Sequence, residues 1–187
     1  MMETMKKFRD LIIEEINVAV AALDLNELQT AVKEIIDADH VFCDGLGRSG
    51  LVVSGFAMRL GQMGKESALV GEATAPAFEK GDLLLLCTAS GSSPTLLHHA
   101  EQAKAYGGKV ILITGRGDSP VAGLADALIL VHAPDKDQSG RQKGSIQPMG
   151  SLFEQTAQLI CDIMSVKLME ELELTSEEMR RRHANIE

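Results

Sequence analysis

The sequence has few aromatic side chains: they make up 3% of its 187 residues, with no Trp and a single Tyr, Tyr106. Hydrophobic residues nevertheless account for 45% and charged residues for 24%, which is the composition of a folded globular chain and excludes a disordered one. The core must therefore be built from Leu, Ile, Val, Ala and Met. A length of 187 residues suits one domain, residues 1–187, with helical extensions.

Long apolar runs are also missing, and none approaches the roughly 18–20 residues that a membrane-spanning helix requires. Residues 1–10 lack the basic-then-apolar order of a signal peptide. The three cysteines, Cys43, Cys87 and Cys161, form neither an even disulfide set nor a CxxC metal pair, and each sits in an apolar run. We expect buried thiols, a protein that does not contact membranes and a cytoplasmic location.

Positive charge is scarce. The chain has 27 acidic and 18 basic residues, for a net charge of −9. Nucleic-acid binding normally needs clustered Lys and Arg, so we expect no nucleic-acid partner. An anionic ligand would need a dedicated local site on such a chain.

The hydrophobic pattern predicts one α/β domain. The first 40 residues show the three- and four-residue spacing of helices. Short apolar runs that alternate with helical stretches then predict a parallel sheet with helical crossovers. The expected strands are 41–43, 67–70, 83–87, 110–114 and 127–131, and the expected later helices are 49–63, 94–106, 151–172 and a short one from Ser176.

The first glycine-rich loop, Gly45 to Gly50, matches the dinucleotide-binding pattern G-x-G-x-x-G. An oxidoreductase would also use an acidic residue after the second strand, for which Glu72 is the candidate. Against this interpretation, 187 residues leave little room for a substrate domain. The dinucleotide hypothesis predicts measurable NAD binding.

The second loop, Thr88 to Ser93, follows a buried strand, precedes a helix and is rich in hydroxyl groups. Several hydroxyls and backbone N–H groups at a helix N-terminus suit a phosphate monoester. The alternative is that Ser92 or Ser93 merely caps the helix that starts at Pro94. A cap needs one hydroxyl, whereas this loop has several.

Five segments together resemble the sugar isomerase (SIS) domain family, and within it the 6-phospho-3-hexuloisomerases: residues 44–50, 70–72, 88–93, 147–155 and 182–187. The resemblance implies a flavodoxin-like, three-layer αβα fold with a five-stranded parallel sheet and helical arms at both ends. It implies a homo-oligomer, commonly a tetramer, with sites at subunit interfaces and no metal or organic cofactor. The implied reaction interconverts D-arabino-hex-3-ulose 6-phosphate and fructose 6-phosphate through an enediol, in formaldehyde fixation or its reverse.

The resemblance also assigns catalytic roles. Glu154 would be the base that moves the proton, although Ser151-x-x-Glu154 also fits a capping box at a helix start. His183 would enter the site of a neighbouring chain, whereas composition alone favours a solvated tail. Arg48 would contact substrate oxygens or the enediolate. The alternative is that Arg48 is an exposed surface residue without a role in the site.

The remaining site assignments concern binding. Phosphate would be held by Gly47, Ser49, Thr88, Ser90 and Ser93, and sugar hydroxyls by Glu72 and Gln147. His98 and His99 are expected on a helix surface. In the family the second loop usually reads Ser-Gly-Ser-Gly-Glu-Thr, and here Ser92 replaces the Glu. The substitution leaves open another SIS phosphosugar isomerase, such as one for arabinose 5-phosphate, or a non-catalytic phosphosugar sensor.

Overall fold

The protein is described here by a computed structural model, which covers residues 1–132 and 145–186. Five parallel strands form one sheet in the order β2-β1-β3-β4-β5. The strands are β1 (Val41–Gly45), β2 (Ser67–Leu69), β3 (Leu83–Thr88), β4 (Lys109–Thr114) and β5 (Ala127–Leu130). The structure confirms the predicted five-stranded parallel sheet.

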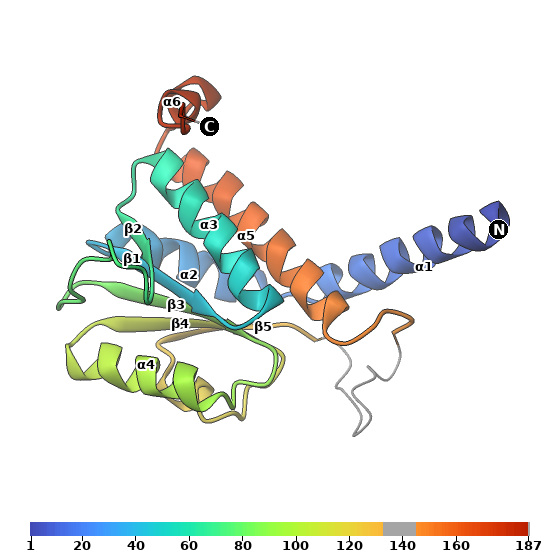
Figure 1. Cartoon of the computed structure of the whole chain (residues 1–187), viewed down its shortest axis with the longest axis horizontal. Coiled ribbons are helices and arrows are strands. Elements are labelled where there is room, and N and C mark those ends of the chain that lie inside the picture. Colours follow the sequence, from blue (N-terminus) through green and yellow to red (C-terminus); the bar gives the residue numbers. More distant parts are fainter. Residues whose placement is uncertain (133–144, 187) are drawn as a thin grey trace.

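Helices cover both faces of this sheet and make three layers (Figure 1). One face carries α2 (Leu25–Asp37), α3 (Arg48–Met63) and α5 (Ser151–Glu171), and the other carries α4 (Pro94–Ala105) and the short 3-10 helix η1 (Ala122–Leu124). Every residue of β3 is buried, because this central strand is covered on both sides.

The strand order changes direction between β1 and β3, which are neighbours in the sheet although β2 lies between them in the sequence. The chain therefore leaves β1 toward α3 on one face and leaves β3 toward α4 on the other. The two loops thus diverge at the carboxyl edge of the sheet, and ligands of such folds usually bind in the crevice between loops placed in this way.

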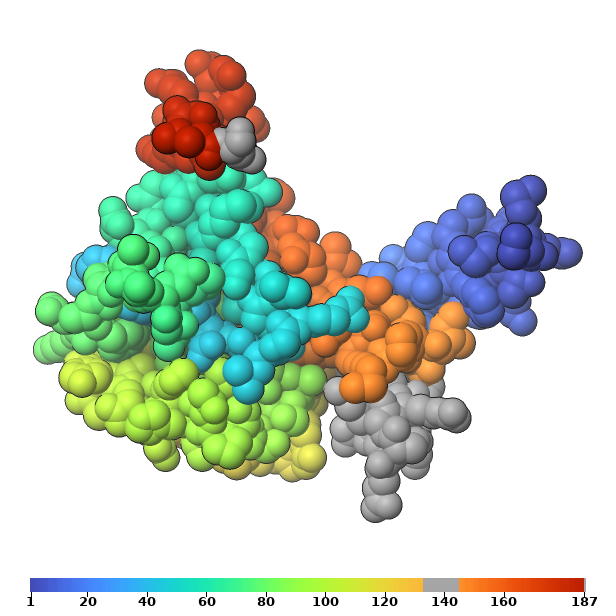
Figure 2. Space-filling model, in the orientation of Figure 1, coloured from blue at the N-terminus to red at the C-terminus, as the bar shows by residue number. Residues whose placement is uncertain are grey.

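Two helical arms extend the domain, as predicted (Figures 1 and 2). Helix α1 (Met2–Ala21) packs along α5 at its C-terminal part and projects from the body at its N-terminus. Helix α6 (Ser176–Arg181) packs on α3 and begins with a capping box, in which the Thr175 and Glu178 side chains and backbones bond reciprocally. No helix in residues 1–132 or 145–186 is long and apolar enough to span a membrane.

Candidate active site

The glycine-rich loop brings α3 unusually close to β1. A Cβ added to Gly50 would lie 2.4 Å from the Gly45 carbonyl oxygen, so both positions require glycine. Gly47, with φ of +60°, caps α3. The G-x-G-x-x-G pattern thus serves tight strand–helix packing, and it places Arg48 and Ser49 in the first turn of α3 at the carboxyl edge.

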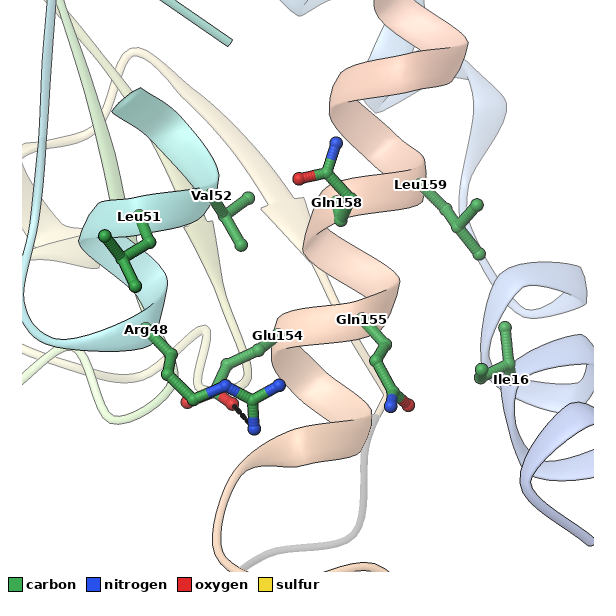
Figure 3. Close-up of a pocket in the computed structure, with 8 residues that line it drawn as sticks. All are labelled: Ile16, Arg48, Leu51, Val52, Glu154, Gln155, Gln158 and Leu159. Atoms are coloured by element: carbon green, nitrogen blue, oxygen red, sulfur yellow. Dashed lines mark ion pairs between the residues drawn. The ribbon is translucent and has the colours of Figure 1, made fainter. Parts of the chain in front are cut away.

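Arg48 connects the first turns of α3 and α5. Its Nη1 donates a hydrogen bond of 2.9 Å to Ser151 Oγ and lies 2.8 Å from Glu154 Oε2 (Figure 3). The Glu154 side chain is 17% exposed, whereas that of Arg48 is 57% exposed. A mostly buried carboxylate therefore faces a cation that solvent and ligands can reach.

The capping box predicted for Ser151 and Glu154 does not form. Helix α5 starts after Gly150, which makes no side-chain cap. Ser151 lies inside the helix, and its hydroxyl donates to the Pro148 carbonyl at 2.8 Å while accepting from Arg48. The sequence pattern failed because the helix begins at Ser151, one residue earlier than a cap at Ser151 requires. The Glu154 carboxylate is consequently left for another role.

Glu154 and Arg48 line a cavity of about 490 Å³ between α1, α3 and α5 (Figure 3). Within the described residues, two buried side-chain oxygens have no aligned hydrogen-bond donor: Glu154 Oε2 and Gln155 Oε1. Glu154 Oε2 has the Arg48 charge nearby without hydrogen-bond alignment. Buried acceptors without donors are rare in folded proteins, so a cavity with two of them suits a ligand rich in hydroxyl groups.

Ser49 is buried and hydrogen-bonds with the thiol of Cys87. Burial raises the pKa of the Cys87 thiol to about 12, while the hydrogen bond with Ser49 lowers it and the nearby Glu154 charge raises it. Ser49 on α3 and Glu154 on α5 thus both lie near the buried sulfur of Cys87. The thiol stays protonated and serves as packing.

The hydroxyl-rich loop folds on itself at the N-terminus of α4. Thr88 Oγ1 accepts from the Gly91 N–H at 3.3 Å, Ser92 donates to Ser90 Oγ at 3.1 Å, and Ser93 Oγ accepts from the Leu96 N–H at 3.5 Å. Ser93 therefore caps α4, as one alternative had it. Ser90 and Ser92 stay exposed at the crevice.

Glu72 and Gln147 lie outside the cavity lining. Glu72 is exposed in the turn after β2. Gln147 is buried, and its Nε2 donates to Glu15 Oε2 at 3.0 Å. The Gln147 amide is thus engaged with α1.

His183 lies at the opposite end of the helix pair. It lines a separate cavity of about 420 Å³ with residues such as Arg59 on α3 and Met169 on α5. From Glu154 to Met169, α5 rises by roughly 22 Å. Within one chain, the structure does not bring the two predicted catalytic residues together.

Sequence reasoning missed a pair on the α4 face. His99 was expected on the surface, but its Nδ1 lies 2.6 Å from Asp44 Oδ2, and its side chain is 30% exposed. Asp44 also accepts from the Gly45 N–H at 2.7 Å. The available signal was a carboxylate at the end of a buried strand, since such a group needs a partner. This pair fastens α4, and hence the hydroxyl-rich loop, to β1.

No group of three or more His, Cys, Asp or Glu side chains is arranged to hold a metal ion within residues 1–132 and 145–186.

Comparison with known proteins gives consistent matches over almost the whole chain. Residues 34–162 match the SIS domain family. A 3-hexulose-6-phosphate isomerase of Bacillus subtilis is 39% identical over 176 residues, covering 94% of this chain and 95% of that protein. One of the same name from Mycobacterium gastri is 37% identical over 177 residues, covering 95% and 88%.

A solved structure shares this architecture. A hypothetical protein of Methanococcus jannaschii superimposes with a TM-score of 0.81 at 33% identity, covering 95% of this chain and 98% of that one. Its crystal structure is described as inferring a molecular function of 3-hexulose-6-phosphate isomerase.

Proposed function

The chain belongs to the SIS domain family, and we propose that it interconverts D-arabino-hex-3-ulose 6-phosphate and D-fructose 6-phosphate as a 3-hexulose-6-phosphate isomerase. The observation that carries the proposal is the buried Glu154 carboxylate facing Arg48, in a cavity with two acceptors that lack aligned donors. The match to isomerases of that name over most of the chain gives the substrate class.

The reaction moves a carbonyl between C3 and C2. Glu154 removes the proton from C2 of the 3-ketose, and the electrons of the C–H bond form the C2–C3 double bond of an enediolate. Glu154 then returns the proton to C3, O3 gains a proton and O2 loses one, which gives the 2-ketose. No atom is gained or lost. Because both carbons are adjacent, one carboxylate on a rigid helix serves both transfers.

Arg48 stabilises the negative charge that develops on the enediolate oxygens. Its guanidinium is more than half exposed and stands beside the base. The N-termini of α3 and α5 lie at the same edge, so both helix dipoles favour negative charge there. These three contributions act on the transition state more than on the neutral carbonyl substrate.

The phosphate binds in the crevice between the two loops. Gly47 and Ser49 come from the start of α3, and Thr88, Ser90 and Ser93 precede the start of α4. Backbone N–H groups at helix N-termini attract phosphate even on a chain of net charge −9. We propose Glu72 and Gln147 as contacts of the sugar hydroxyls. For Gln147, such a contact competes with its hydrogen bond to Glu15.

His183 of a neighbouring chain completes the site. It handles the proton between substrate oxygens and helps open the ring of fructose 6-phosphate, a step that the open-chain 3-ketose does not need. Within one chain, His183 and Glu154 lie at opposite ends of α5. A homotetramer with interfacial sites also covers apolar side chains that a single chain exposes, among them Phe8, Leu51, Met58 and Val166.

The cellular setting follows from the substrate. We place the enzyme in the cytoplasm, in the ribulose monophosphate pathway of formaldehyde fixation or its reverse, acting without metal or organic cofactor. A phosphosugar sensor is the second candidate, because Ser92 stands where the family usually has Glu.

Purified protein assayed separately on hexulose 6-phosphate, arabinose 5-phosphate and glucosamine 6-phosphate tests the proposal. We expect rapid conversion of the first to fructose 6-phosphate and negligible turnover of the other two. Binding of all three without turnover would instead indicate a sensor. Turnover of arabinose 5-phosphate alone would move the chain to another isomerase of the family, and measurable NAD binding would revive the dinucleotide hypothesis.

A further inference from the structure

The segment that leads into α5 is held by one carboxylate on the N-terminal arm. Glu15 of α1 accepts a 2.8 Å hydrogen bond from the Ile146 N–H at Oε1. Its Oε2 accepts from Ser145 Oγ at 2.7 Å and from Gln147 Nε2 at 3.0 Å. Three consecutive residues thus converge on one side chain that lies 130 to 132 positions away in the sequence.

These bonds favour the charged form of Glu15. Partial burial opposes ionisation, but the hydrogen bonds from Ile146, Gln147 and Ser145 outweigh it and hold the pKa of Glu15 below its ordinary value. Hydrogen bonds to a charged group are stronger than neutral ones, so the clamp is firm at neutral pH.

Immediately after the clamped residues, the backbone is strained. Met149 adopts φ of +57°, a left-handed conformation that non-glycine residues rarely take. Such strain persists only where surrounding contacts fix the chain, and it concentrates at functional sites. Pro148 and Ser151 flank this turn, and the Ser151 hydroxyl bonds to both the Pro148 carbonyl and Arg48.

We infer that Glu15 is a positioning residue of the active site, which sets the first turn of α5 and thereby the placement of Arg48 and Glu154. The contacts run from Glu15 through Gln147 and the strained turn to Ser151, and from Ser151 to Arg48. Ile16, the next residue of α1, lines the cavity itself. The inference rests on the proposed function, because it assumes that Arg48 and Glu154 act on the substrate.

Glu15→Ala tests the inference against Glu14→Ala, the adjacent exposed carboxylate of the same helix. We expect Glu15→Ala to lower kcat about tenfold or more, since displacement of reacting groups by about 1 Å costs up to a hundredfold. Inhibition by inorganic phosphate should stay at the wild-type level, because the phosphate loops lie on other elements. Glu14→Ala should match wild type in both.

The exchange variant Glu15→Gln with Gln147→Glu adds a readout that a general loss of stability would not produce. It keeps an amide–carboxylate pair with the partners reversed, so it should recover part of the kcat that Gln147→Glu alone loses. Wild-type kcat in folded Glu15→Ala would overturn the inference, as would equal losses in both alanine variants. Failure of the proposed function looks different, because the wild-type protein itself would then turn over no hexulose phosphate.

Discussion

The two ends of the α3–α5 helix pair differ in charge and in construction. At the carboxyl edge of the sheet, both helix N-termini meet, and Arg48 of α3 contacts Ser151 and Glu154 of α5. At the other end, both C-termini meet α6, which buries Met179 and donates from Arg182 to the Gln62 carbonyl at 3.5 Å. The first end favours negative charge and the second favours positive charge.

This difference matches the division of the site that we propose. Arg48 and Glu154 lie together within one chain. His183 lies at the other end, after α6, a helix that begins with its own capping box and is followed by Arg182. The proposed site is therefore complete only where the α6 end of one chain meets the Arg48–Glu154 cavity of another.

The largest effect is expected at Glu154. Glu154→Gln keeps the side-chain size but cannot take up the substrate proton, so turnover should fall a hundredfold or more. Glu170→Gln, an exposed carboxylate near the other end of α5, should leave turnover unchanged. Steady-state kinetics and thermal melting of both variants check this. Near wild-type turnover of Glu154→Gln would remove Glu154 from the mechanism.

A somewhat smaller loss is expected at Arg48. Arg48→Met removes the charge beside Glu154 and the bond to Ser151, and kcat should fall roughly a hundredfold, the lower end of the loss when one oxyanion donor is removed. Arg48→Lys should recover only part, because a lysine ammonium lacks the planar fork of the guanidinium. If Arg48→Met alters KM alone, Arg48 binds ground-state substrate and does not stabilise the enediolate.

A moderate effect is expected in the crevice. Inorganic phosphate should inhibit competitively, and Ser90→Ala or Thr88→Val should each weaken that inhibition severalfold, since one hydrogen bond contributes about 1 kcal/mol. The inhibition constant of phosphate measured on residual Glu154→Gln activity should equal that of wild type. Non-competitive inhibition, or inhibition unaffected by both loop variants, would place phosphate elsewhere.

The smallest effect concerns the arm. Hydrogen bonds from the Thr175 backbone N–H and hydroxyl lower the pKa of Glu178 below its ordinary value. The cap is therefore intact at neutral pH and is lost once the pH falls below the ordinary glutamate range. Glu178→Gln should exchange α6 amide hydrogens faster than wild type at pH 7, and the difference should vanish at acid pH below that range. If Glu177→Gln accelerates α6 amide exchange by the same amount, the cause is the lost negative charge and not the cap.

The fold was largely predictable because each element carries its own signal. The apolar run Leu83–Cys87 could only be a strand covered on both faces, and Gly107 after α4 marked the end of that helix. Strand boundaries differed by one or two residues, as for β1, which continues through Asp44 and Gly45.

The site was only partly predictable, because its geometry depends on contacts distant in sequence. Glu154 and Arg48 were named, but their ion pair spans more than 100 residues and leaves no local pattern. The capping-box motif at Ser151 was a correct local pattern overridden by tertiary contact with Arg48. Glu15 and the Asp44–His99 pair had no motif at all.

The division of the site between chains is tested most directly by mixing two inactive variants, His183→Ala and Glu154→Gln, after mild dissociation. If each site combines Glu154 of one chain with His183 of another, random exchange gives wild-type residues at about a quarter of the sites. We therefore predict that isomerase activity returns to about a quarter of wild type. A mixture that stays inactive, while mass measurements show that the chains have exchanged, would contradict the account.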